Sequence, residues 1–346
     1  MAAISEGEVA VYDRQLRLWG VQAQQRLLNA KVLIWGLEGS NVETCKNLVL
    51  AGVALVVCDH RSAEAADVNF NYFLRSQDIG SNRAECAAER VREMNPLCTV
   101  STAKIPAEEA DSMDALRKVL QGYNFVLVAP SVLGWNFERI CSIDAVCRET
   151  GVGFALTVGC GEIAFFFTDL GSHTVQERSS AQGSASAEAQ GTAPEPETVE
   201  FPSFKELLGC SPADLQKRKV DASILLVALF IAFARSRPSG VQPDQGAAFQ
   251  AYCRDSMGSL PVVDGLSDLA EAYRLFFLEP LVHVASIVGG LLTQEVIKAI
   301  TARDVPLANC VCFNAHTGAA LVERIPGVSA VSKKRKVEEV ADILDD

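Results

Sequence analysis

The sequence predicts an α/β fold in which a mostly parallel, doubly wound sheet is covered by helices on both faces. Short apolar strands without polar alternation recur along the chain, helical patterns separate them, and a glycine turn follows the first strand. The composition agrees, because 49% of the 346 residues are hydrophobic and 21% are charged, as in chains that bury a core. The formal charge of −12 argues against nucleic-acid binding through bulk charge.

The expected elements are assigned from apolar runs and helical spacing. Helices are expected at 8–30, 39–51, 83–94, 111–121, 135–149, 219–235, 246–257, 266–278 and 281–301. Strands are expected at 31–35, 53–58, 97–105, 123–129, 153–158, 162–168, 309–314 and 319–323. The strand at 162–168 follows its predecessor through a tight turn, which predicts an antiparallel edge. The longest apolar run, 222–234, is too short to cross a bilayer, so no membrane partner is expected.

Two segments interrupt this pattern. Residues 176–198 lack Val, Leu, Ile, Met and aromatic residues, so we expect a disordered insert within a single domain at 8–327. Residues 328–346 are expected to form a flexible tail. Its cationic block comprises Lys333, Lys334, Arg335 and Lys336 and is typical of a nuclear-import signal, although a merely solvated tail has the same composition. We therefore expect a nuclear protein, with a cytoplasmic pool as a further expectation.

The cysteines and histidines predict no metal site. There are 11 cysteines and 4 histidines, without a C-x-x-C pair or metal-ligand spacing. Buried free thiols explain this pattern better than disulfides or zinc. Cys210 lies in a loop before a possible helix, where its pKa could be lowered, but an incidental cysteine is the favoured interpretation.

A nucleotide site is suggested by the turn after the first strand. Gly36-Leu-Glu-Gly39 precedes a helix whose free N–H groups favour an anion, and Asp59 ends the next strand, where a carboxylate can hold ribose hydroxyls. The spacing departs from the dinucleotide fingerprint, and Glu38 within the turn would repel phosphate. The alternative is that these glycines serve only the tight turn and helix packing.

A more specific motif is Tyr12-Asp-Arg-Gln-Leu-Arg-Leu-Trp-Gly20, since an amphipathic helix requires neither its aromatic residues nor its glycine. With the glycine turn, 80–85, Met94-Asn-Pro96 and the helix at 288–298, it resembles the adenylation half of the enzymes that activate ubiquitin-like modifiers, a ThiF-like fold. Length and detail are most similar to the smaller, regulatory subunits that serve SUMO. The resemblance implies a non-thioester subunit of a ligase-type activating enzyme, paired with a larger catalytic subunit.

The departures from this family imply a degenerate nucleotide site. No Arg directly follows Asn71, Arg83 stands where the family has a Lys, and Ala129-Pro-Ser131 replaces a metal-binding Asp. Without that carboxylate and that Arg, Mg²⁺ and the triphosphate each lose a ligand. The resemblance thus implies that the partner binds ATP and Mg²⁺, and that this chain binds no cofactor tightly. The vestigial positions are Gly36, Gly39, Asp59, Asn69, Asn71 and Arg83.

The same resemblance implies that Arg14 reaches in trans into the partner's ATP site. Arg17 and Trp19 are candidate interface residues, with core packing as the alternative for Trp19, and Gly289 and Gly290 open a helix that suits an interface or core packing equally. Two other function classes remain open. They are a self-sufficient homodimeric ThiF-type adenylating enzyme and a nucleotide-binding oxidoreductase.

Overall fold

The computed structural model describes residues 4–175, 196–237, 239–257, 261–266 and 268–326. The cationic block of the tail and residues 176–195 of the expected insert lie outside these described residues.

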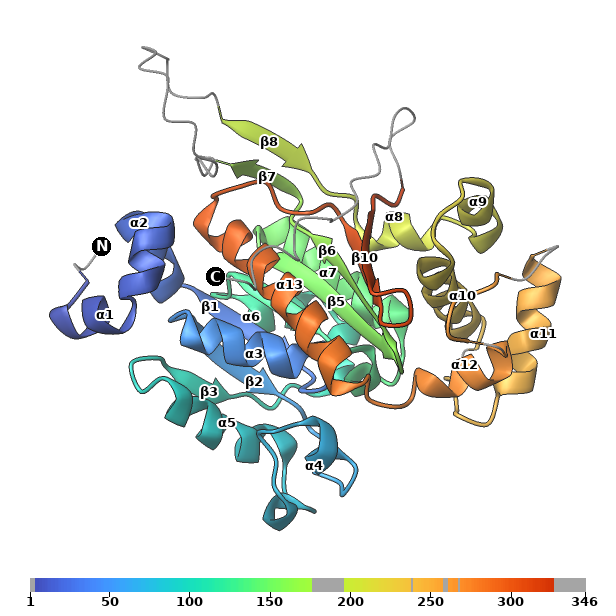
Figure 1. The fold of residues 1–346 in the computed structure, drawn as a ribbon, viewed down its shortest axis with the longest axis horizontal. Coiled ribbons are helices and arrows are strands. Elements are labelled where there is room, and N and C mark those ends of the chain that lie inside the picture. Colours follow the sequence, from blue (N-terminus) through green and yellow to red (C-terminus); the bar gives the residue numbers. More distant parts are fainter. Residues whose placement is uncertain (1–3, 176–195, 238, 258–260, 267, 327–346) are drawn as a thin grey trace.

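A mixed sheet forms the centre of the molecule (Figure 1). Within the described residues it has eight strands in the order β10-β9-β6-β5-β4-β1-β2-β3. The strands are β1 (Lys31–Trp35), β2 (Ala54–Cys58), β3 (Val100–Thr102), β4 (Phe125–Val128), β5 (Gly153–Cys160), β6 (Ile163–Asp169), β9 (Cys310–Asn314) and β10 (Ala319–Glu323). From β3 to β5 all pairs are parallel, whereas β6, β9 and β10 add antiparallel pairs, so the predicted fold class is confirmed.

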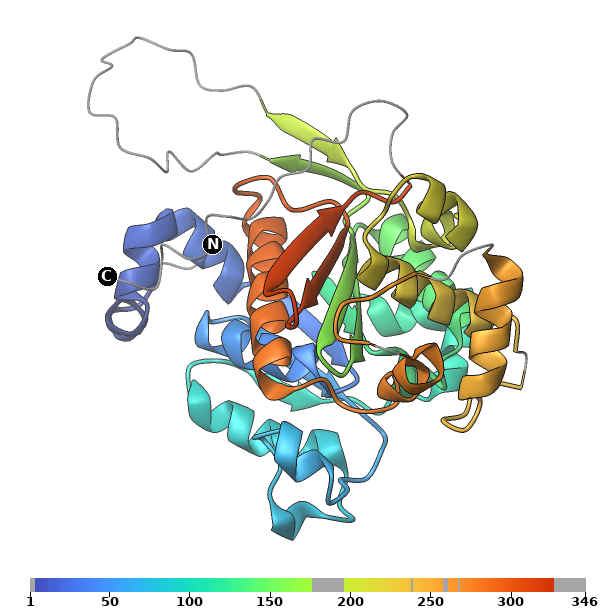
Figure 2. The same cartoon turned by 45° about the vertical axis from the view of Figure 1, so that its right-hand side comes forward.

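Helices cover both faces of this sheet (Figures 1 and 2). The α-helices are α1 (Glu6–Val11), α2 (Asp13–Leu28), α3 (Ser40–Leu50), α4 (Asp67–Phe70), α5 (Arg83–Met94), α6 (Met113–Leu120), α7 (Phe137–Thr150), α8 (Phe204–Leu208), α9 (Pro212–Lys217), α10 (Ala222–Arg235), α11 (Gly246–Ser256), α12 (Leu269–Leu275) and α13 (Val282–Thr301). Short 3₁₀ turns lie at η1 (Ser76–Asp78), η2 (Ala107–Asp111) and η3 (Pro130–Leu133).

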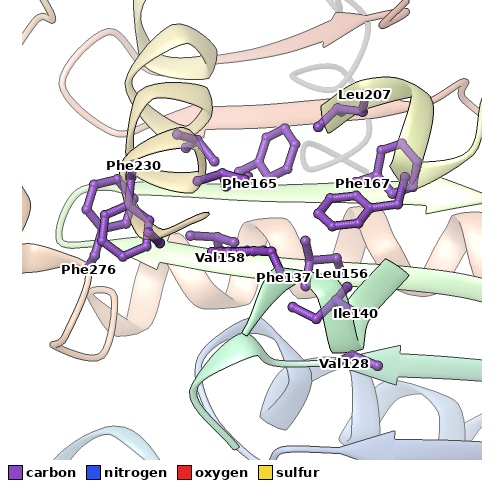
Figure 3. Close-up of a cluster of buried hydrophobic side chains, with 14 of the residues drawn as sticks. Val128, Phe137, Ile140, Leu156, Val158, Phe165, Phe167, Leu207, Phe230 and Phe276 are labelled. Atoms are coloured by element: carbon purple, nitrogen blue, oxygen red, sulfur yellow. The ribbon is translucent and has the colours of Figure 1, made fainter. Parts of the chain in front are cut away.

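The pleat divides the apolar side chains between two cores. One core joins one face of the sheet to α6–α12, and the other joins the opposite face to α2, α3, α5 and α13. Figure 3 shows the first core, where Phe165 and Phe167 of β6 lie between the sheet and helices α8 and α10. Because both faces are covered, successive residues of the parallel strands are apolar instead of alternating with polar ones.

Several local features differ from the sequence prediction. The short helices α4 and α8 were not predicted, and the strand expected at 97–105 is observed only as β3, Val100–Thr102. The helix expected at 8–30 is two helices, and Gly20, with φ 82°, interrupts the second of them. A two-stranded ribbon, β7 (Ser172–Val175) with β8 (Glu197–Glu200), was not predicted. Because β8 begins at Glu197, the expected insert extends two residues too far.

Helix α13 packs along α3, and a Cβ at Gly289 would lie 2.5 Å from the Cβ of Glu43. By length and composition alone this 20-residue helix would suffice to cross a membrane, but half of its most apolar window is buried inside the protein. The helix is therefore used here as a core element.

Candidate functional site

A cleft of about 660 Å³ lies at the carboxyl ends of the parallel strands. The glycine turn follows β1, Asp59 follows β2, and Pro130-Ser131 follows β4. Strand β1 lies between β2 and β4, so the chain reverses its winding direction at this point of the sheet. Ligands of open α/β sheets bind in the crevice at such a switch point.

The glycine turn has the close packing that its residues predict. Gly36 has φ 102°, and a Cβ there would lie 2.7 Å from the Cβ of Ala129, so both the backbone angle and the space require glycine. Asn41, at the start of α3, donates from Nδ2 to the carbonyl of Gly36 at 3.0 Å and accepts from Oγ1 of Thr157 at 3.1 Å. The turn is thereby fixed to β5.

An ion-pair network centred on Arg61 lies at the end of β2. Arg61 binds Asp59 through two nitrogens at 2.9 and 2.7 Å, and its Nη1 donates to Glu38 at 2.7 Å and to Ser131 at 2.9 Å. Burial alone would raise the pKa of Asp59, but the hydrogen bonds and charge of Arg61 outweigh it and hold this pKa below its usual range. The carboxylate expected to hold ribose hydroxyls is therefore committed to Arg61.

Another carboxyl group, that of Glu279, lies beside the second glycine of the turn. Oε2 of Glu279 accepts the backbone N–H of Gly39 at 2.6 Å, and Oε1 lies 3.5 Å from Nη2 of Arg83. Arg83 also pairs with Asp67 at 3.1 Å, and its side chain is only 5% exposed. Burial and the charge of Glu38, opposed by Arg83, raise the pKa of Glu279 to about 8.

These residues do not fit ATP and Mg²⁺. The turn N–H that would bind a phosphate is already bonded to Glu279, and Glu38 adds negative charge beside it. Acidic side chains outnumber basic ones around the cleft, and the strand end after β4 carries a hydroxyl, Ser131, in place of a carboxylate. We derive no adenylation step in this cleft.

The two asparagines that the sequence analysis named as vestigial site residues differ in burial and in hydrogen bonding. Asn71 is buried, donating from Nδ2 to the carbonyl of Leu37 at 3.3 Å and accepting the N–H of Phe73. Asn69 is exposed and has no side-chain hydrogen bond to a described residue. Only Asn71 supports the glycine turn.

Arg14 lies far from this cleft, at the amino ends of the strands. Its neighbour Tyr12 is buried there, and the Tyr12 hydroxyl accepts from Nδ2 of Asn95 at 2.8 Å and contacts the position of a Cβ at Gly52, just before β2. Arg14 itself is exposed and has no ion-pair partner among the described residues. Arg17, by contrast, pairs with Asp13 at 2.9 Å.

Of the other interface candidates, Trp19 and Gly289 already make contacts within this chain. Trp19 donates to Gln24 at 2.9 Å, and its carbonyl accepts from Arg303. Gly289 is buried against α3, so it serves internal packing. Gly290 has nothing within 4 Å of where its Cβ would lie and remains available to a partner.

No cysteine has the properties of a thioester-forming nucleophile. All 11 cysteines are free thiols within the described residues. Burial is the main cause that raises the pKa of each of them, including Cys210, whereas a nucleophilic thiol needs a lowered pKa. Among the described residues, no group of three or more His, Cys, Asp or Glu side chains suits a metal ion.

Arg61 and Glu279 were not identified in the sequence analysis as residues of the cleft. Arg61 follows Asp59 by two positions, so an arginine beside a strand-end carboxylate was a usable signal. Glu279 is 240 residues from its partner Gly39, and no local pattern marks it.

The family model described as "ThiF family" matches residues 12–332. SUMO-activating enzyme subunit 1 of Xenopus tropicalis is 30% identical over 349 residues, covering 93% of this chain and 97% of the relative. The protein of the same name from Homo sapiens is 30% identical over 345 residues, covering 92% and 96%.

Among solved structures, a crystal structure of PaaA has a TM-score of 0.58 at 16% identity and covers 94% of this chain and 85% of PaaA. The microcin C7 biosynthetic enzyme MccB in complex with N-formylated MccA has a TM-score of 0.55 at 14% identity, covering 94% and 74%. These two likenesses concern the fold alone. The chain belongs to the ThiF family, alongside the SUMO-activating enzyme subunit 1 sequences that it matches.

Proposed function

We propose that this chain is the regulatory, non-thioester subunit of a heterodimeric SUMO-activating enzyme. It pairs with a larger catalytic subunit, which binds ATP and Mg²⁺, and it supports adenylation of the modifier there. The name of its relatives gives the modifier, and the raised cysteine pKa values suit a subunit without a thioester. The cleft of this chain, filled by its own carboxylates, suits a subunit whose partner carries the nucleotide.

The observation that carries the proposal is the position of Arg14. It is exposed and unpaired among the described residues, and it lies at the opposite end of the strands from its own cleft. A guanidinium in that position can serve a nucleotide only on another chain. Adenylation joins a carboxylate to the α-phosphate of ATP and expels pyrophosphate, so charge builds up on phosphate oxygens that an arginine stabilises.

The test is ATP–pyrophosphate exchange by the reconstituted pair. Arg14→Ala should lower the exchange rate on the order of 100-fold with an intact heterodimer, because one charged donor to the transition state is lost. Arg14→Lys should recover only part of the rate, since an ammonium cannot make the bidentate contact.

Arg17→Ala is the matched comparison on the same helix, because Arg17 is an interface candidate that is already paired with Asp13. At a partner concentration that saturates the heterodimer, it should leave most of the exchange rate. Unchanged exchange in Arg14→Ala would refute the role of Arg14. Exchange by this chain without its partner would instead favour the self-sufficient homodimeric enzyme.

We further propose nuclear localisation through Lys333, Lys334, Arg335 and Lys336. Changing these four residues to Ala in a tagged full-length chain should abolish its nuclear enrichment. The matched control changes four acidic residues of the same tail, Glu338, Glu339, Asp342 and Asp345, to Ala. Retained enrichment after loss of the cationic block would contradict the assignment.

A further inference from the structure

Glu279 contacts two donors of the cleft that suit a phosphate group. One oxygen accepts the N–H of Gly39 at 2.6 Å, where the 11-residue helix α3 begins, and the other lies 3.5 Å from Nη2 of Arg83. A free N–H at a helix start and an arginine are the common pair of donors to a phosphate oxygen.

The segment that carries Glu279 is held firmly in this position. The ring of Pro280 lies 3.2 Å from the position of a Cβ at Gly39 and 2.8 Å from the position of one at Gly159 of β5. Leu281 donates its N–H to the carbonyl of Gly161 at 3.0 Å, and α13 begins at the next residue. The carboxylate is thus built into the connection between α12 and α13.

Arg83 retains binding capacity beyond what Asp67, at 3.1 Å, and Glu279, at 3.5 Å, use. Its side chain is 5% exposed, and its Nε has no hydrogen-bond partner among the described residues. A buried guanidinium nitrogen without a partner is costly, and a larger anion with more oxygens would satisfy it. Burial beside Glu38 also raises the pKa of Glu279 to about 8, so this carboxyl group is held against an electrostatic penalty.

We propose that Glu279 is a built-in substitute for a phosphate group: it occupies the N–H of Gly39 and the guanidinium of Arg83, and so excludes phosphate-bearing ligands from this chain's own cleft. The occupant of this site is then a carboxyl group of the polypeptide itself. This inference deepens the proposed function at the same cleft, but it does not depend on Arg14.

The test is calorimetric titration of the full chain with inorganic pyrophosphate at neutral pH. Glu279→Ala removes the carboxyl group from the N–H of Gly39 and from Arg83. It should strengthen pyrophosphate binding at least about tenfold over the wild-type chain, since one charge-assisted hydrogen bond changes the affinity by about that factor. Glu279→Gln is the matched control. Its amide keeps the size of the side chain and an oxygen for the N–H of Gly39, so this variant should bind pyrophosphate no better than the wild-type chain does.

A third variant, Glu279→Ala combined with Arg83→Gln, should lose the gain, because the guanidinium is then absent. The proposal is overturned if folded Glu279→Ala binds no better than wild type, or if Glu279→Gln gains as much as Glu279→Ala. Should Glu279→Ala fail to fold, Glu279→Asp retracts the carboxylate by one methylene and should show a smaller gain; no gain would overturn the proposal. The exchange assay on Arg14 variants does not depend on the pyrophosphate titration. The proposed role of Arg14 and the proposed role of Glu279 can therefore be refuted separately.

Discussion

Asp144 is a buried acid whose environment predicts a definite pH dependence. It lies in α7 at 1% exposure, and Oδ2 accepts the N–H of Phe204 at 2.9 Å. Burial first, and then the charge of Asp169, raise the pKa of Asp144 well above its usual range. Asp169 itself is held by Arg148 at 2.7 Å. The folded protein therefore binds a proton at Asp144 more tightly than the unfolded chain does.

We expect Asp144→Asn to stabilise the protein at neutral pH. Because the folded pKa is the higher one, the contribution of Asp144 is fully present below the unfolded pKa, about 4, and is lost as pH rises toward the folded pKa. Asn keeps the acceptor for Phe204 without the charge, so chemical denaturation at pH 4 and pH 7 should show a gain that grows with pH.

Asp111→Asn is the control for this prediction. Asp111 is a surface carboxylate, and its hydrogen bonds with Arg139 lower its pKa. Its replacement should give no gain in stability at pH 7. A gain in Asp144→Asn that is equal at both pH values would contradict the assigned cause.

The residues of the cleft show what local sequence can and cannot predict. Gly36, Gly39 and Asp59 lie at the turn and the strand end where the sequence analysis expected them, because one βαβ unit contains all three. Glu279 could not be predicted, since its role arises from a contact with a residue 240 positions away in the sequence. The family resemblance implied that ligands of a nucleotide site are missing, and the structure shows which side chains lie in the cleft.

At the scale of elements, the packing of α13 on α3 depends on one glycine. A Cβ at Gly289 would lie 2.5 Å from the Cβ of Glu43 and 2.8 Å from the carbonyl oxygen of Ser40, so the two helices must separate to admit it. Gly289→Ala should lower the free energy of unfolding by about 1–3 kcal/mol, as overpacking does.

Gly290→Ala is the neighbouring control, because nothing lies within 4 Å of where its Cβ would be placed. It should be neutral or stabilising by up to about 1 kcal/mol, the usual advantage of Ala over Gly inside a helix. Equal losses in the two variants, measured by denaturant unfolding, would show that Gly289 does not set the spacing of the helices.

Elements with strong periodicity were predicted well, and short ones were not. Helix α5 was predicted with its observed bounds, since Asn82 caps its start and Asn95-Pro96 follows its end. The ribbon of β7 and β8 was missed because each strand has only four residues and the sequence between them has no apolar pattern. The break at Gly20 was missed because the apolar spacing continues through it.

At the scale of the whole molecule, helices α1 and α2 project from one end of the protein (Figures 1 and 2), and Arg14 lies in α2. Their apolar side chains are unusually exposed for residues of this kind. The exposed fractions are 43% for Val9, 59% for Val11, 69% for Leu18 and 55% for Val21. An apolar surface beside an unpaired arginine fits the proposed contact with a larger subunit.

If Arg14 enters the partner's site, Leu18 must lie near that partner, because residues four apart share one face of a helix. Leu18→Glu should then weaken the heterodimer by about tenfold or more, since it places a charge in an apolar contact, and ATP–pyrophosphate exchange should recover at high partner concentration. Val262→Glu is the control, because Val262 is 85% exposed but lies beyond α11, away from α2. Titration of a labelled catalytic subunit measures both affinities. Equal dissociation constants for Leu18→Glu and the wild-type chain would place the partner elsewhere and would also remove the physical basis for the role of Arg14.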